Sequence, residues 1–362
     1  MNRDNFSESH IRALQSGSKR DPGLIERTVF AFGLLDALCE VGLPFVFKGG
    51  TSLMLLLKHP RRLSTDIDIV VAPGTDIGRY LEKAAKVFPF LAREEQVRFG
   101  KNRIEKRHFK FTYLSPVRNS EFYILLDVLF EDHQYLRTVK RPISNDLLLP
   151  SDVSHEVEMP DVNCILGDKM TAFAPHTTGI PLGCDKDLEV VKQFYDVATL
   201  IEEVDTPGLV QGTFNRLVPI EAGYRGVEVD PDDVLSDIIS TAHSIGSRGK
   251  IGSADYPFLL KGMKAFGGHV YGERFSAETA IQLAPQVMYF AECMRRGMPF
   301  VRPDAKNLSL TIAKPELRCF KVLRIVNPMA YAYVTQLDAL LISIGGADAG
   351  NKPQRGDKHL KA

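Results

Sequence analysis

The sequence predicts an α+β protein in which a mixed sheet with flanking helices is followed by a mainly helical second domain. Short apolar strands alternate with helical segments in the first 150 residues, whereas long stretches beyond Pro150 carry apolar side chains at helical spacing. A chain of 362 residues is also long enough for two domains. We therefore expect an α/β domain at 1–150, a helical domain at 151–345 and a disordered polar tail at 346–362.

Hydrophobic periodicity defines the elements of the predicted N-terminal domain. A helix is expected where apolar side chains recur at helical spacing, and it stops at Gly42-Leu43-Pro44. The predicted order is a helix at 24–41, a strand at 45–47, a glycine turn at 48–50, a helix at 51–58, a strand at 66–71, a helix at 76–88, and strands near 103–114 and 122–130.

Four longer helices are predicted in the C-terminal domain, again from the spacing of apolar residues. They span residues 165–173, 188–203, 232–247 and 277–296.

Composition excludes several classes of protein. The chain has no apolar run near the roughly 20 residues that span a bilayer, and its polar start lacks the apolar stretch of a secretory signal. The five cysteines show no CxxC spacing, which argues against a zinc site or a disulfide framework. The formal net charge is zero, so only local basic patches are left as candidates for nucleic-acid binding. We expect a cytoplasmic protein that does not enter membranes.

Two aspartates alternate with isoleucines in the strand predicted at 66–71. A strand places residues two apart on the same face, so the side chains of Asp66 and Asp68 project together. Two close carboxylates are costly to ionise unless a cation neutralises them, and such hard oxygen ligands favour Mg²⁺ or Mn²⁺. The pattern alone is weak because Asp-x-Asp also occurs at 185–187 and 230–232.

A glycine turn precedes this strand. Gly49, Gly50, Thr51 and Ser52 lie where a short strand ends and a helix begins. Backbone N–H groups at a helix N-terminus form a cradle for phosphate oxygens, and the Thr51 and Ser52 hydroxyls are expected to add donors. An isolated pair of glycines is usually a plain tight turn. A phosphate cradle followed closely by a carboxylate pair, however, predicts a nucleotide and metal site.

A third aspartate interrupts the apolar strand near 122–130. An unpaired buried carboxylate is costly, so Asp127 needs either a partner or a metal, and a hydrogen-bonded edge position is the alternative. Three carboxylates on neighbouring strands can bind two metal ions, one at the attacking hydroxyl and one at the triphosphate. We therefore predict a metal site formed by Asp66, Asp68 and Asp127.

Four sequence motifs resemble those of a known family. They are FKGGTSL at 47–53, RLSTDID at 62–68, GDKMTAF at 167–173 and KQFYDV at 192–197. In type and order they are similar to the motifs of the AbiEii/AbiGii-type toxins, which are nucleotidyltransferases of the DNA polymerase β-like superfamily. The resemblance covers residues 45–200, and it implies a polymerase β-like nucleotidyltransferase fold for the N-terminal domain.

The resemblance also implies roles for residues outside the aspartate strand. Lys169 would contact the triphosphate, and its compact ammonium suits a charge-dense phosphate. Asp196 would orient Lys169, the nucleotide or the acceptor hydroxyl, so that the helical domain contributes both residues to the site. Ser64 would contact phosphate or be regulatory. A solvated lysine and a helix-surface salt bridge are the alternatives for Lys169 and Asp196, and Gln193 departs from the family, which has an aspartate there.

The implied enzyme is Mg²⁺-dependent, with Mn²⁺ as a second candidate, and transfers NMP from an NTP to an acceptor hydroxyl with release of pyrophosphate. Asp127 would act as a general base or as a metal ligand on the attacking side. The implied biological role is the toxin of an AbiE-like bacterial toxin–antitoxin system in phage defence, with tRNA as acceptor and a cognate antitoxin as partner. Two alternatives stay open: nucleotidylation of a protein or small molecule, and a catalytically silent binding module of the same fold.

Two basic stretches are candidates for tracking an RNA backbone, although such runs are usually solvated faces. The first contains Lys58, His59, Arg61 and Arg62, and the second contains Arg98, Lys101, Arg103, Lys106, Arg107, His108 and Lys110.

Overall fold

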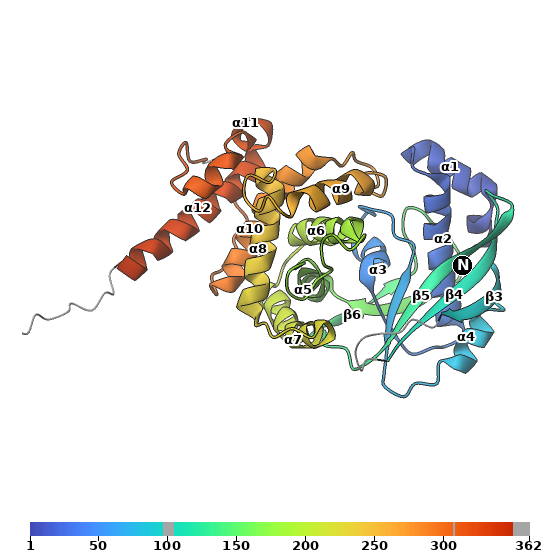
Figure 1. Ribbon diagram of the computed structural model, residues 1–362. Coiled ribbons are helices and arrows are strands. Elements are labelled where there is room, and N and C mark those ends of the chain that lie inside the picture. Colours follow the sequence, from blue (N-terminus) through green and yellow to red (C-terminus); the bar gives the residue numbers. More distant parts are fainter. Residues whose placement is uncertain (97–104, 307, 350–362) are drawn as a thin grey trace, which may run out of the picture.

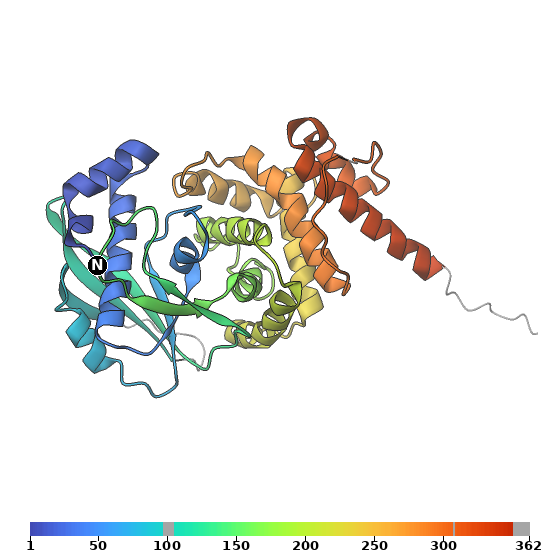
Figure 2. The same cartoon turned by 180° about the vertical axis from the view of Figure 1, so that it is seen from behind.

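The computed structural model describes residues 1–96, 105–306 and 308–349. A sheet-containing N-terminal half lies beside a helical C-terminal half (Figures 1 and 2). The first half comprises η1 (Arg3–Phe6), α1 (Glu8–Ser18), α2 (Pro22–Glu40), β1 (Val46–Lys48), α3 (Gly49–Leu56), β2 (Ile67–Val71), α4 (Gly78–Ala84), β3 (Phe90–Gln96), β4 (Lys106–Ser115), β5 (Ser120–Phe130), β6 (Thr138–Pro142) and β7 (Glu156–Pro160). The second comprises α5 (Val162–Ala172), α6 (Asp187–Ile201), α7 (Pro207–Arg225), α8 (Pro231–Ser247), α9 (Tyr256–Phe266), α10 (Ala277–Arg295), η2 (Pro315–Phe320), α11 (Leu323–Val326) and α12 (Pro328–Ala349).

The main sheet has five strands in the order β1-β2-β5-β4-β3. It is mixed, because β2 runs parallel to β5 while the other neighbours are antiparallel. The register places Asp68 of β2 between Lys48 of β1 and Asp127 of β5. The predicted α+β class with a mixed sheet is confirmed, and the parallel pairing is what sets two aspartates side by side.

Helix α2 forms much of the core against the sheet. Its N-terminus is capped by Asp21, which accepts a hydrogen bond from the backbone N–H of Leu24, and Pro22 occupies the first turn. Both Phe30 and Leu34 of this helix are buried in the same apolar cluster as Phe109 of β4. Burial of each such side chain stabilises the fold by roughly 1.5–3 kcal/mol, so this helix fixes the sheet that carries the aspartates.

Short helix α3 joins the two halves of the molecule. Its residues Met54 and Leu55 pack in the apolar cluster of the sheet, whereas Leu53 and Leu57, which follows the helix, pack in the cluster formed by the C-terminal helices. The N-terminus of α3, at the glycine turn, is therefore held by packing on both sides.

The C-terminal half is helical, as expected. Helices α5, α6, α8 and α10 match the four predicted segments within a few residues, and α7, α9 and α12 occupy segments for which no element was predicted. None of the helices within the described residues is long and apolar enough to span a membrane.

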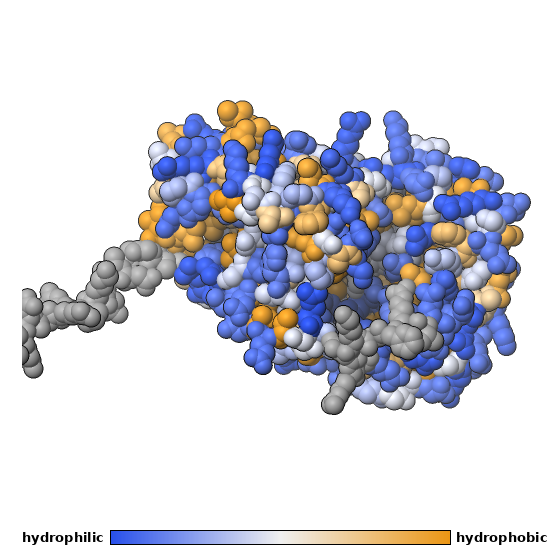
Figure 3. All heavy atoms as spheres, in the orientation of Figure 1, coloured by the Kyte–Doolittle hydropathy of each residue, from blue (hydrophilic) through white to orange (hydrophobic). Residues whose placement is uncertain are grey.

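The last helix, α12, extends away from the body of the molecule (Figure 1). It continues to Ala349, so residues 346–349 are helical where a disordered tail was expected; the rest of that tail lies outside the described residues. In the view of Figure 3 hydrophilic side chains cover most of the surface, and apolar ones gather over α11 and α12. Exposed side chains there include Val322, Ile325, Val326 and Met329.

Candidate active site

A cleft of about 830 Å³ opens between the sheet and helices α5, α6 and α7. It brings together seven of the ten predicted site residues, from segments far apart in the sequence: Gly49, Gly50, Ser64, Asp66, Asp68, Asp127 and Lys169. The other three, Thr51, Ser52 and Asp196, are buried behind its walls.

The glycines are required by their surroundings. Gly49 has a φ of 79°, a left-handed conformation that disfavours other residues, and a Cβ atom here would overlap the carboxylate of Asp68. A Cβ atom on Gly50 would overlap the guanidinium of Arg62 and approach the Ser64 hydroxyl to 3.0 Å. The turn therefore needs glycine to bring the start of α3 against the aspartate strand.

The predicted contribution of Thr51 and Ser52 is corrected by the structure. Both side chains are fully buried, and each hydroxyl donates to a backbone carbonyl: Thr51 Oγ1 to Asp66 at 2.6 Å and Ser52 Oγ to Gly49 at 2.8 Å. These hydroxyls fasten α3 to the strand and close its first turn. Neither residue lines the cleft, so only Gly49 and Gly50 of the predicted phosphate-binding turn lie at its surface.

The three carboxylates of the predicted metal site, Asp66, Asp68 and Asp127, have different surroundings. Burial, followed by the charges of Asp127 and Asp66, raises the pKa of Asp68 to about 7. Burial also raises the pKa of Asp66, although Arg27 lies 3.5 Å from its Oδ1 and opposes this. Asp127 lies on β5, which is an interior strand and not an edge strand, and its Oδ1 is hydrogen-bonded to Nδ1 of His108 on β4 at 2.6 Å.

These carboxylates would fit a Mg²⁺ ion whose remaining ligands come from the substrate and from water. Among the described residues, no three Asp, Glu, His or Cys side chains lie close enough to ligate one ion by themselves. Mg²⁺ in polymerase-type sites is usually held by one or two carboxylates together with substrate phosphates and water. Asp68 and Asp127 are direct neighbours across β2 and β5. Burial and the charges of Asp127 and Asp66 raise the pKa of Asp68, and a cation bound there would stabilise its ionised form.

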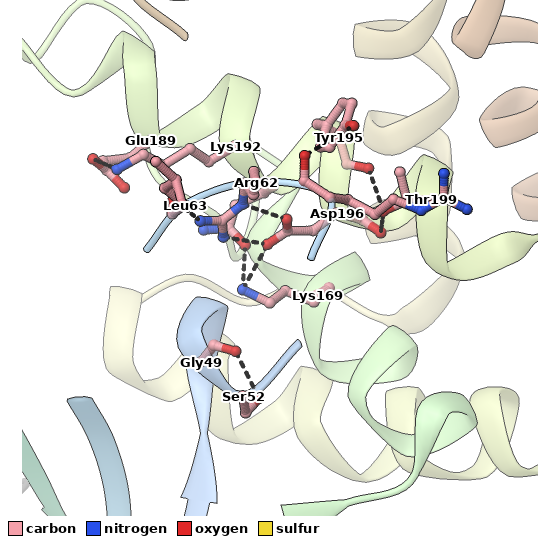
Figure 4. A network of polar contacts seen from close by, with 12 residues as sticks. Gly49, Ser52, Arg62, Leu63, Lys169, Glu189, Lys192, Tyr195, Asp196 and Thr199 are labelled. Atoms are coloured by element: carbon pink, nitrogen blue, oxygen red, sulfur yellow. Dashed lines mark hydrogen bonds and ion pairs between the residues drawn. The ribbon is translucent and has the colours of Figure 1, made fainter. Parts of the chain in front are cut away.

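Lys169 of α5 is held over the cleft by α6. Its ammonium lies 3.1 Å from Asp196 Oδ2 (Figure 4). It also donates a hydrogen bond to Gln193 Oε1 at 3.1 Å. Arg62 binds the same carboxylate through two bonds, Nε to Oδ1 at 2.6 Å and Nη2 to Oδ2 at 2.7 Å. Asp196 is only 1% exposed, so the alternative of a helix-surface salt bridge is excluded. Burial opposes its ionisation, but Arg62 and Lys169 together lower its pKa.

Sequence reasoning missed a second buried ion pair at the cleft. Lys48, at the end of β1, lies 3.3 Å from Asp168 of α5, and the Tyr135 hydroxyl donates to the same carboxylate at 2.7 Å. Burial opposes the charge of Asp168, yet Lys48 and the tyrosine hydroxyl keep its pKa below the ordinary value. Lys48 and Asp168 belong to the motifs at 47–53 and 167–173, and their place in these motifs is the feature of the sequence from which their role in the cleft could have been predicted.

Most described members of the two basic stretches are engaged by neighbours. Arg107 pairs with Glu95 at 2.7 Å, His59 with Asp146 at 2.7 Å, and Arg62 is buried. Lys106 alone of the second stretch lines the cleft, whereas Arg98, Lys101 and Arg103 lie outside the described residues. The basic stretches therefore give little support for a continuous RNA-binding track.

Comparison with known proteins agrees with this geometry. The model of a family described as the nucleotidyl transferase AbiEii toxin, type IV TA system, matches residues 34–269. This chain belongs to the AbiEii family. The match includes the glycine turn, Asp66, Asp68 and Asp127, and both helices that hold Lys169, so this chain is a nucleotidyltransferase. Membership of this toxin–antitoxin family implies an NTP substrate and an antitoxin partner.

Two solved structures resemble this chain distantly. JHP933 from Helicobacter pylori is 13% identical, with a TM-score of 0.43 over 75% of this chain and 94% of that chain. An antigenic nucleotidyltransferase-like protein from Paracoccidioides brasiliensis is 15% identical, with a TM-score of 0.34 over 56% of this chain and 94% of that chain. No curated protein matches the chain.

Proposed function

We propose that this AbiEii-family protein is a Mg²⁺-dependent toxin that transfers NMP from an NTP to a hydroxyl of tRNA. The observation that carries the proposal is one cleft that is lined by the glycine turn, by the neighbouring Asp68 and Asp127, and by Lys169, whose ammonium is held by Asp196. Phosphoryl-type transfer depends on positioning and charge neutralisation more than on covalent chemistry. The cleft supplies groups for both tasks.

The residues of the cleft suggest a division of labour. The backbone of Gly49 and Gly50, with Lys169, would bind the triphosphate, and Asp68 with Asp127 would hold Mg²⁺. When bound, this ion would neutralise the triphosphate and lower the pKa of the acceptor hydroxyl. The acceptor oxygen forms its bond to the α-phosphorus, the bond to the bridging oxygen breaks, and pyrophosphate leaves. Asp127, held by His108, would receive the hydroxyl proton.

The choice of a tRNA acceptor rests on the cleft itself and on the toxin family. Lys186 and Arg225 line the cleft and form no ion pair with any described residue, so they can neutralise phosphates of a polyanionic acceptor. Modification of tRNA would also explain toxicity, because it blocks translation. A cognate antitoxin would then relieve this effect in the cell.

The decisive assay offers several acceptors to the protein. Each α-³²P-labelled NTP is incubated with total tRNA, with cell protein or with small-molecule extract, in Mg²⁺ or in EDTA. We expect label on tRNA that requires Mg²⁺ and disappears in the Asp66→Ala/Asp68→Ala double variant. Label on protein or on a small molecule instead would replace the tRNA proposal, and an absence of label on every acceptor would contradict transfer.

A further inference from the structure

A second pocket lies where the two halves of the molecule meet, outside the cleft. This junction pocket has a volume of about 320 Å³, within the roughly 300–1,000 Å³ that is usual for ligand sites. It is lined by the first turn of α2, the hairpin of β4 and β5, and the end of α9, and it shares no lining residue with the cleft. Figures 1 and 2 show α2 and α9 on opposite sides of this junction.

Two arginines supply the hydrogen-bond donors of the junction pocket. The guanidinium groups of Arg27 on α2 and Arg118 on the hairpin lie 5.6 Å and 5.0 Å from the ring centroid of Phe122. These cation–π contacts favour positions of both side chains at the pocket wall. Arg118 is exposed and pairs with no carboxylate in the described part of the chain, and Arg27 Nε is buried without a hydrogen-bond partner. Both arginines therefore have donors left for a ligand.

The nearby carboxylates do not use up these donors. Asp21 is the only carboxylate among the described residues that line the pocket, and its Oδ1 caps α2 by accepting the Leu24 N–H at 2.9 Å. Glu26 is buried behind the wall and already accepts three hydrogen bonds from β4 and the hairpin. Asp66 contacts Arg27 from the side of the cleft, at 3.5 Å. An anion in the pocket can thus reach the remaining N–H groups of both arginines.

The junction pocket is joined to the active site on two walls. On one wall, the Arg27 guanidinium alone separates the pocket from Asp66, which lines the cleft. On the other, the backbone carbonyl of His269 accepts a hydrogen bond from the N–H of Leu63 at 2.8 Å, close to the aspartate strand. Burial and neighbouring cations, Lys192 foremost, lower the pKa of His269 to about 4, so its ring is neutral at pH 7. The pocket is therefore an extension of the active site with its own cationic wall.

We propose that the junction pocket binds a phosphate of the acceptor RNA, next to the hydroxyl that reacts in the cleft. The inference rests on the proposed function for the identity of the acceptor. In an in-line transfer the acceptor approaches the α-phosphorus from the side opposite the leaving pyrophosphate, so it needs contacts away from the glycine turn. Each nucleotide of an RNA carries a phosphate close to its hydroxyls, and guanidinium groups bind phosphate through paired hydrogen bonds. A phosphate held by Arg27 and Arg118 would place the acceptor beside Asp66.

The test measures RNA binding without catalysis. Fluorescently labelled, unfractionated tRNA is titrated with the full-length protein in EDTA and without NTP, and anisotropy gives the association constant over a series of NaCl concentrations. The variant is Arg118→Gln, which removes one exposed guanidinium. The matched control is Arg324→Gln on α11, an exposed arginine in another part of the molecule (Figure 1). Inorganic tripolyphosphate is titrated into the same proteins by calorimetry, as a probe for the triphosphate of the NTP.

We expect Arg118→Gln to bind tRNA about fivefold more weakly than wild type at 0.1 M NaCl. The slope of the logarithm of the association constant against the logarithm of the NaCl concentration should become less negative by about 0.7, which corresponds to one lost phosphate contact on a single strand. Arg324→Gln should bind tRNA as wild type does, and tripolyphosphate should bind equally to wild type and Arg118→Gln.

Equal tRNA affinity and salt dependence in wild type and Arg118→Gln would overturn the inference, and so would an equal loss in Arg324→Gln. A parallel loss of tripolyphosphate binding in Arg118→Gln would assign this arginine to the NTP and also overturn it. If wild type does not bind tRNA at all, the inference and the tRNA acceptor both fail. If binding depends on Arg118 but no tRNA is labelled in the transfer assay, only the proposed transfer fails.

Discussion

Replacement of Asp196 by asparagine should destabilise the protein strongly. Asp196 is 1% exposed and accepts two bonds from Arg62 while also contacting Lys169, so the variant leaves two buried cations without a counter-charge. Removal of one partner from a buried pair costs about 3–5 kcal/mol. Because domains are typically stable by only about 5–15 kcal/mol, a substantial part of the total free energy of unfolding is expected to disappear.

Urea unfolding of wild type and Asp196→Asn, followed by circular dichroism, measures this loss. The matched control is Glu202→Gln, which removes a half-exposed carboxylate 3.8 Å from Arg61. An exposed pair of this kind contributes less than about 1 kcal/mol, so the control should unfold almost as wild type does. A change below about 1 kcal/mol in Asp196→Asn would refute the view that this carboxylate neutralises a buried cluster.

Two further predictions concern the wall of the cleft. Burial and the neighbouring aspartates raise the pKa of Asp68 to about 7, so the metal-free native state retains this proton between about pH 4 and pH 7 while the unfolded chain loses it. The free energy of unfolding of the wild-type protein should therefore fall as the pH rises through this range. Asp68→Asn should melt at a higher temperature than wild type at pH 8. An equal or lower melting temperature of the variant would argue against the raised pKa. Gly49→Ala should be more destabilising than Gly42→Ala. Both glycines have positive φ, but only the methyl group added at position 49 meets a carboxylate, that of Asp68. Equal melting temperatures for these two variants would show that Asp68 does not confine the turn.

The local parts of the site could be predicted from the sequence. Alternation of aspartate and isoleucine with period two indicates a strand with one polar face, and paired glycines before a helix indicate a tight turn. The structure has a strand, β2, that carries Asp68 and begins just after Asp66, and it has the tight turn at the start of α3. The direction of the Thr51 and Ser52 hydroxyls could not be predicted, because it depends on which backbone carbonyls the packed helix brings near.

Long-range pairing was beyond sequence reasoning. Arg62 and Asp196 are 134 positions apart, and no local pattern shows that a lysine, an arginine and an aspartate will share one buried cluster. Helix α7 was missed because Pro219 and several glycines lower its intrinsic helix propensity, whereas packing against α5 stabilises it in the fold.

The most direct test of nucleotidyl transfer in this cleft compares wild type with Asp68→Asn in a single-turnover assay with α-³²P-labelled NTP, Mg²⁺ and tRNA. The variant should fold at least as stably as wild type at pH 8, so a loss of activity cannot be attributed to unfolding. We predict labelled tRNA with wild type and a loss of at least a hundredfold in the rate with Asp68→Asn, equivalent to about 3 kcal/mol of transition-state stabilisation. Equal rates of labelling by the two proteins would contradict the assignment of the reaction to these carboxylates.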